Sequence, residues 1–194
     1  MVTRFGYGTT GSVVVVDSDG NSRELAGLDA TRRRIGLALA PDGTLYTSWF
    51  TKSGQNPRVG GVGRLTLEAT ATEPLLVEGL KKPVGVLATD TELIISDQDL
   101  GQIVIASRND PSTLSVRATV SGLDLIAAGP DGSVFVGGTD GAVRRVTVSG
   151  EVTSIAAGFL QVRGVAWDSA HRRIFIAEHD SVGSAHALHI LPLD

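Results

Sequence analysis

The sequence contains no cysteine and only one methionine among its 194 residues. Without cysteine, a disulfide framework, a thiolate metal site and a cysteine nucleophile are all excluded. An excess of positive charge is also missing, because 17 lysines and arginines stand against 21 acidic residues and the net charge is -4. Nucleic-acid-binding surfaces normally carry such an excess on one face, so we expect no nucleic-acid partner.

Long hydrophobic runs are missing as well, and stretches such as Val13 to Val16 have only the length of a strand. A helix that spans a bilayer needs about 20 apolar residues, so we expect no membrane segment. The first six residues do not show the basic region and apolar run of a secretory leader. We therefore expect a cytoplasmic protein, with export by a leader that precedes this sequence as the alternative.

Glycine, in contrast, is plentiful, with 24 residues that include repeated Asp-Gly pairs. Such pairs are typical of tight turns between short strands, and almost no stretch shows the period of a helix. With 42% hydrophobic and 20% charged residues, the chain can bury a sizeable core and is too apolar to be disordered. We expect one all-β domain over residues 1–194.

Four segments of the chain align as an internal repeat: residues 35–46, 84–95, 124–136 and 163–176. Each segment has a strand of small residues, a turn and a strand rich in β-branched or aromatic residues. The equivalent positions Gly36, Gly85, Leu125 and Gly164 are 49, 40 and 39 residues apart. Periods of about 40 residues are typical of four-stranded propeller blades.

The repeat predicts a β-propeller of four to five four-stranded antiparallel blades. The units span approximately residues 1–30, 31–80, 81–123, 124–160 and 161–194. The N-terminus supplies third and fourth strands and a fragment of a second at Val2 to Phe5, whereas the C-terminus supplies first, second and third strands. The two ends could close the ring and hide two sheet edges. The alternative is an open arc that a partner or a further segment completes.

The pattern Gly36-Leu37-Ala38 followed by Pro41-Asp42-Gly43 and a hydrophobic strand resembles the blade motif of NHL-repeat proteins. It is similar also to the propellers of the SMP-30/gluconolactonase and streptogramin-lyase type. The resemblance covers nearly the whole chain and implies the fold, but its members include lactonases, lyases and modules that only bind. The enzymes hold acidic, Asn or His residues in a central cavity, and no such set can be placed on this sequence.

Loops that follow each second strand and precede each first strand share one face of a propeller. The longest of them is the insertion of residues 48–62, and aromatic and arginine residues there indicate a contact surface. The alternatives are solvated turn residues, and aromatics that end a strand and pack on a neighbouring blade. The predicted binding face comprises Arg33, Trp49, Phe50, Lys52, Arg58 and Lys82.

All four histidines lie in the last 24 residues, and Glu178-His179-Asp180 follows a predicted strand. Imidazole and carboxylate groups are common metal ligands, so Glu178 and His179 are candidates for a divalent metal. The same two residues, with Asp97, are the candidate catalytic groups. The alternative is a chance cluster of polar loop residues, and we predict no other cofactor.

Two functions therefore remain open from the sequence. The preferred one is a non-catalytic binding or scaffolding module that docks a protein partner, or a second copy of itself, through its loop face. The alternative is a metal-assisted enzyme of the lactonase or lyase type with a site near the propeller axis.

Overall fold

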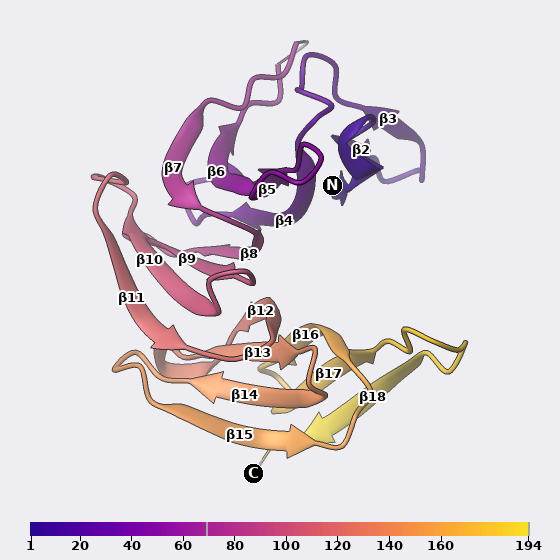
Figure 1. Cartoon of the computed structure of the whole chain (residues 1–194), viewed down its shortest axis with the longest axis vertical. Coiled ribbons are helices and arrows are strands. Elements are labelled where there is room, and N and C mark those ends of the chain that lie inside the picture. The colour runs from indigo at the N-terminus through magenta and orange to yellow at the C-terminus, as the bar shows by residue number, and fades with distance from the viewer. Residues whose placement is uncertain (69, 194) are drawn as a thin grey trace. The chain divides into compact units, whose positions relative to one another are not determined.

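The computed structural model describes residues 1–68 and 70–193, and in these ranges the chain forms five antiparallel β-sheets (Figure 1). Three sheets have four strands and two have three, so each sheet is a blade or most of one. The predicted all-β propeller of four to five antiparallel blades is thereby confirmed, and the number of blades is five. Among the described residues, no helix has the length and apolar character needed to cross a bilayer.

The first two sheets come from the N-terminal part of the chain, and their strands are neighbours in the order of the sequence. The first sheet comprises β1 (Val2–Arg4), β2 (Ser12–Val16) and β3 (Ser22–Glu24), with a short 3-10 turn, η1 (Gly6–Gly8), between the first two strands. The second comprises β4 (Arg33–Leu39), β5 (Leu45–Thr51), β6 (Val59–Leu65) and β7 (Leu75–Leu80).

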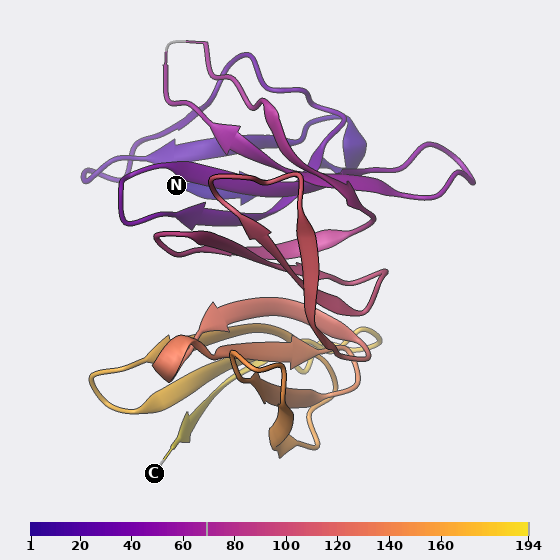
Figure 2. The same ribbon diagram turned by 90° about the vertical axis from the view of Figure 1, so that its left-hand side faces the viewer.

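The other three sheets follow the same sequential order, as the colours of Figures 1 and 2 show. The third comprises β8 (Pro83–Ala88), β9 (Glu92–Asp97), β10 (Gln102–Ser107) and β11 (Leu114–Thr119). The fourth comprises β12 (Leu123–Ala128), β13 (Val134–Gly138), β14 (Ala142–Val146) and β15 (Val152–Ala157), with η2 (Pro130–Gly132) after β12. The fifth comprises β16 (Val162–Asp168), β17 (Arg173–Glu178) and β18 (Ala187–Pro192).

The Pro-Asp-Gly segments form the turns that the sequence predicts. Between β4 and β5, the Gly43 N–H donates to the Ala40 carbonyl at 2.9 Å, and Gly43 has a φ of 85°. Only glycine adopts this conformation at little cost. The Asp42 carboxylate accepts the N–H of Thr44 at 3.0 Å, which closes the turn and sets the register of the hairpin.

The chain divides into two compact units, of which the first contains residues 1–100 and 105–114 and the second residues 101–104 and 115–194. In the first unit, buried apolar side chains of the first two sheets pack together, including Val13, Leu25 and Leu45. In the second unit, Phe135 of β13 packs with Ile174 of β17. The first and second sheets thus pack together in the first unit, and the fourth and fifth pack together in the second, because a twisted sheet cannot bury both faces alone.

The strands at the two ends of the chain agree with the expected partial blades. The expected fragment at Val2 to Phe5 is β1, which pairs with β2 through Val2 and Val14. The expected third strand near the C-terminus is β18, which pairs with β17 through Phe175 and Ile190. Whether these ends close one ring stays a prediction.

Candidate functional site

The beginning of β4 and the end of β5 carry the residues from which a site can be built. Arg33 pairs with Phe50 and Arg34 pairs with Trp49 in the β4–β5 register. Because successive side chains of a strand point to opposite faces, the Arg33–Phe50 pair and the Arg34–Trp49 pair lie on different faces of the second sheet. Two distinct clusters follow from this alternation.

The first cluster surrounds the ring of Phe50. The charged groups of Arg33, Arg58 and Lys82 lie 5.8, 5.7 and 5.8 Å from the ring centroid. The ring of Phe5 meets it edge-on at 5.8 Å, and Arg33 lies 5.6 Å from that ring as well. We call these five residues the Phe50 cluster. Cations this close to an aromatic face are attracted by its quadrupole, which keeps three like charges in a small space.

Arg33 has an unusual place in the Phe50 cluster because its guanidinium lies near two aromatic rings and has no partner among the described residues. Its Nε is buried and unbonded, and we find no hydrogen bond or ion pair of Arg33 within residues 1–68 and 70–193. Its terminal nitrogens reach solvent. Other arginines of the same unit do pair with carboxylates, namely Arg4, Arg32, Arg34, Arg58 and Arg108.

Tyr7 lies beside the Phe50 cluster and is the most exposed aromatic residue near it, with 79% of its surface open. Its ring packs edge-on against Phe5 at 5.0 Å. Its backbone has a φ of 51°, a left-handed conformation that is costly for a residue with a side chain. A rigid turn therefore presents this ring to solvent.

Asp97 holds two loop segments in place, one before β8 and one after β9. Its carboxylate accepts the N–H groups of Lys81 at 2.6 Å and Lys82 at 3.1 Å, and those of Asp99 and Leu100, both at 3.1 Å. The residue is fully buried. Its oxygens are thus committed to holding the segment before β8 and the segment after β9, which brings Lys82 to the ring of Phe50.

Arg58 is held by an ion pair across two loops. Its Nη1 donates to both carboxylate oxygens of Asp99, at 2.9 and 2.6 Å, and both side chains are about one-third exposed. Pairs this exposed contribute about 1 kcal/mol or less to stability. Lys52, the other predicted basic residue of this insertion, is exposed in the β5–β6 loop.

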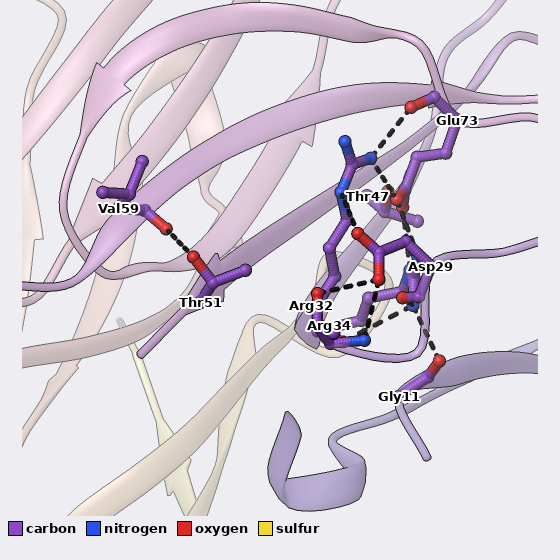
Figure 3. Close-up of polar contacts among 9 residues, drawn as sticks. Gly11, Asp29, Arg32, Arg34, Thr47, Thr51, Val59 and Glu73 are labelled. Atoms are coloured by element: carbon purple, nitrogen blue, oxygen red, sulfur yellow. Dashed lines mark hydrogen bonds and ion pairs between the residues drawn. The ribbon is translucent and has the colours of Figure 1, made fainter. Parts of the chain in front are cut away.

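The second cluster lies on the opposite face and centres on a buried ion pair between Arg34 and Glu73 (Figure 3). Arg34 Nε donates to Glu73 Oε1 at 2.9 Å and Nη2 donates to Oε2 at 2.7 Å. Arg32 Nη1 adds a bond of 2.7 Å to Oε2, and the hydroxyl of Thr47 bonds Oε1. Both carboxylate oxygens of Glu73 therefore accept hydrogen bonds from two donors each, as buried polar atoms require.

The ionisation of Glu73 reflects this balance. Burial disfavours its charge, but the hydrogen bonds and positive charge of Arg34, together with Thr47 and Arg32, outweigh burial and hold the pKa of Glu73 below its usual value of 4.5. The same guanidinium of Arg34 donates to the carbonyl of Gly11 at 2.9 Å and of Asp29 at 3.0 Å. The first sheet is therefore tied to the beginning of β4, directly beside Arg33.

The predicted contact residue Trp49 belongs to the second cluster and not to the surface. It is only 6% exposed, and the guanidinium of Arg32 stacks 3.9 Å from its ring centroid. Phe50 is 1% exposed. Trp49 and Phe50 therefore agree with the alternative in which both aromatics end a strand and pack inside the protein. Phe50 contributes to the predicted face only as a buried ring with three cations near it.

The histidine-rich end of the chain offers a local polar cluster in the second unit. Glu178 accepts the Leu160 N–H at 2.7 Å and bonds Nε2 of His189 at 2.7 Å, and these two contacts lower its pKa. His179 lies 5.0 Å from the ring of His186, and its buried Nδ1 has no partner. Among the described residues, no group of three or more ligand-type side chains has the arrangement to hold a metal ion.

Phe5 and Tyr7 were not among the predicted site residues, although the sequence contains a signal for them. An aromatic residue between two glycines, as in Gly6-Tyr7-Gly8, is typical of a tight exposed turn. Glu73 gave no such signal, because its partner Arg34 is 39 residues away in the chain.

Comparisons with known proteins relate this chain to solved propellers. No protein-family profile matches it, and comparison with curated proteins also gives no match. A gluconolactonase from Xanthomonas campestris superimposes with a TM-score of 0.73 at 18% identity, over 97% of this chain and 67% of that one. Virginiamycin B lyase from Staphylococcus aureus gives 0.58 at 15% identity, over 96% and 64%. A chain of the nidogen–laminin complex gives 0.71 at 14% identity, over 88% and 67%.

The chain spans 64 to 67% of the length of these three solved chains. At such low identities the likeness establishes the β-propeller fold. The expected resemblance to gluconolactonase-like and streptogramin-lyase-like propellers is confirmed at that level.

Proposed function

We propose that this chain is a non-catalytic binding module that docks a protein partner, or a second copy of itself, through the Phe50 cluster and Tyr7. The observation that carries the proposal is the convergence of Arg33, Arg58 and Lys82 on one buried ring, in a chain whose net charge is -4. A local basic face on an acidic chain attracts an acidic surface and orients it.

The composition of this face supports the proposal independently of its charge. Tyrosine and arginine are the residues most enriched at the energetic centres of protein interfaces. Tyr7 packs edge-on against Phe5, and the guanidinium of Arg33 lies 5.6 Å from the same ring, so both side chains already have a contact that restricts their freedom before binding. Support also comes from the nidogen–laminin complex, where a chain of this fold occurs in a protein–protein complex.

The test is capture of partners by the purified chain, compared between the wild type and the double variant Arg33→Glu, Arg58→Glu. We expect each captured protein to be lost with the variant and retained with Arg64→Glu, which reverses a charge near the other end of β6. Light scattering of the same samples decides whether the partner is a second copy. Unchanged capture by the double variant, with an unchanged melting temperature, would remove this face from consideration.

The second candidate is a metal-assisted enzyme of the lactonase or lyase type. Two observations favour it: the fold is shared with a gluconolactonase and with a virginiamycin B lyase, and His179 keeps a buried Nδ1 without a partner among the described residues. The other candidate groups argue against it, because their carboxylates are occupied by hydrogen bonds within the chain. Asp97 accepts four backbone N–H groups, and Glu178 is bonded at both oxygens.

A further inference from the structure

We propose that Arg33 binds a carboxylate of an acidic peptide segment, and that this contact is the anchor of the docking face described above. The inference rests on the proposed function and names the chemistry of the partner. It starts from one observation: the guanidinium of Arg33 lies 5.6 and 5.8 Å from the ring centroids of Phe5 and Phe50 and bonds no carboxylate of its own chain within the described ranges.

An unpaired cation in a half-buried position carries a desolvation cost that a structure normally removes by pairing. Here Asp99, a carboxylate that pairs with a member of the Phe50 cluster, is bonded to Arg58. Arg33 therefore keeps donors for an acceptor that comes from outside. The guanidinium is also suited to this, because its planar fork of donors can form two parallel bonds to a carboxylate.

The backbone behind Arg33 is shaped to keep it in place. A Cβ atom on Gly8 would lie 3.3 Å from Nε and 3.6 Å from Nη2 of Arg33, and Gly8 has a φ of 86°. The turn can thus approach the guanidinium closely only because it has no side chain at this position. On the strand side, Arg34 is fixed by Glu73, which leaves its neighbour Arg33 little freedom to move away.

The arrangement favours an extended acidic peptide over a single small anion. Each of the three cations lies about 6 Å from the centroid of Phe50. Arg58 is already paired with Asp99 and Lys82 with Gln98, so these two add positive charge beside a carboxylate that Arg33 binds. Tyr7 offers an exposed ring beside them, against which the aliphatic part of a glutamate side chain can pack. A free phosphate would make no use of that ring.

The experiment is an NMR titration of the ¹⁵N-labelled chain, following the Nε–H signal of Arg33, with three probes. Hexaglutamate is the acidic peptide, hexaglutamine is its uncharged match, and inorganic phosphate is the small anion. We expect hexaglutamate alone to shift the signal in a saturable way. Arg33→Gln should weaken the Kd roughly tenfold or more, as the loss of a charged hydrogen bond implies.

Two further variants separate a specific site from general charge. Arg33→Lys keeps the charge but loses the paired geometry, so its Kd should fall between those of the wild type and Arg33→Gln. Arg64→Gln removes the same charge from an exposed residue and should leave the Kd within about twofold. Equal weakening by Arg33→Gln and Arg64→Gln, or equal responses to phosphate and hexaglutamate, would overturn the proposal.

The titration also distinguishes this inference from the proposed function. If partner capture depends on Arg33 and Arg58 but hexaglutamate does not bind, the docking face stands and its carboxylate chemistry is wrong. If hexaglutamate binds at Arg33 but capture is indifferent to the double variant, the carboxylate site stands and the docking function is wrong.

Discussion

Glu73 holds the guanidinium of Arg34 through both of its carboxylate oxygens, at 2.9 and 2.7 Å, and neither side chain is more than 3% exposed. The pair connects the segment before β7 with the first residues of β4 (Figure 3). Because Arg33 directly precedes Arg34, this buried pair fixes the backbone from which Arg33 reaches the Phe50 cluster. The buried pair that stabilises the chain and the proposed binding residue are therefore linked through two adjacent arginines that point to opposite sides of one strand.

Replacing Glu73 with glutamine should destabilise the chain strongly. The change leaves Arg34 buried without a counter-charge, which typically costs about 3–5 kcal/mol of unfolding free energy. Urea denaturation followed by tryptophan fluorescence measures it. The matched control is Glu24→Gln, which breaks an ion pair with Arg4 whose side chains are both 50% exposed and should cost less than about 1 kcal/mol. Similar losses for the two variants would show that the buried pair contributes no more than a surface pair.

The contribution of Glu73 should also disappear in acid. Its pKa is lowered on folding, so its stabilising effect is present in full above the unfolded value of 4.5 and is lost as the pH falls through the lower folded value. The free-energy difference between the wild type and Glu73→Gln should therefore be constant near neutrality and shrink below pH 4.5. Denaturation curves over this range test the sign, and a difference that grows on acidification would contradict it.

The fold could be predicted from the sequence because its signals are local and repeated. Each Pro-Asp-Gly turn and each strand of small residues lies within a short window, and the repeat supplied the order of the strands. Phe50, Arg33 and Lys82 could be assigned to one face because loop positions in a blade are fixed by topology. Fold prediction thus needed no knowledge of long-range contacts.

The details of the site depend on contacts that no local pattern contains. Trp49 and Phe50 are adjacent in the sequence, but strand alternation places them on opposite faces of the sheet. The ring of Trp49 therefore contacts Arg32, whereas the ring of Phe50 lies near Arg33. Asp97 looked like a catalytic acid because it ends a strand. Its role in binding four backbone N–H groups depends on loops before β8 and after β9, which only the folded chain brings together.

Asp97→Ala should both destabilise the chain and weaken peptide binding. Four N–H donors lose their acceptor, and those of Lys82 and Leu100 belong to half-buried residues. Each buried donor left unsatisfied costs about 1–3 kcal/mol, so we expect a loss of about 2 kcal/mol or more. Lys82 is no longer held at Phe50, and the affinity for hexaglutamate should fall with it. The measurements are thermal unfolding and the NMR titration at a temperature where the variant is folded. A stable Asp97→Ala variant would contradict a structural role for this carboxylate.

A metal screen by thermal shift separates the two candidate functions. An ion that binds only the folded chain must raise its melting temperature. If the chain is a binding module, Ca²⁺, Mg²⁺, Mn²⁺ and Zn²⁺ should change the melting temperature of the wild type and that of His179→Ala by the same amount. A rise of several degrees that His179→Ala abolishes would instead support the metal-assisted enzyme, and it would place the ion at the C-terminal histidine cluster.

Asp99→Asn offers a gain of function, which unfolding cannot mimic. Asp99 neutralises Arg58 in the free chain, and both side chains are about one-third exposed, so the substitution should cost less than about 1 kcal/mol of stability. It removes the carboxylate that is bonded to Arg58 of the Phe50 cluster, and hexaglutamate should then bind about two- to fivefold more tightly at low salt, with the gain declining as salt screens the charges. The control is Asp90→Asn, the same charge change in the exposed turn before β9. Because both variants alter the net charge equally, a gain seen only with Asp99→Asn assigns the acidic peptide to this cluster, whereas equal gains would assign it to the overall charge of the chain.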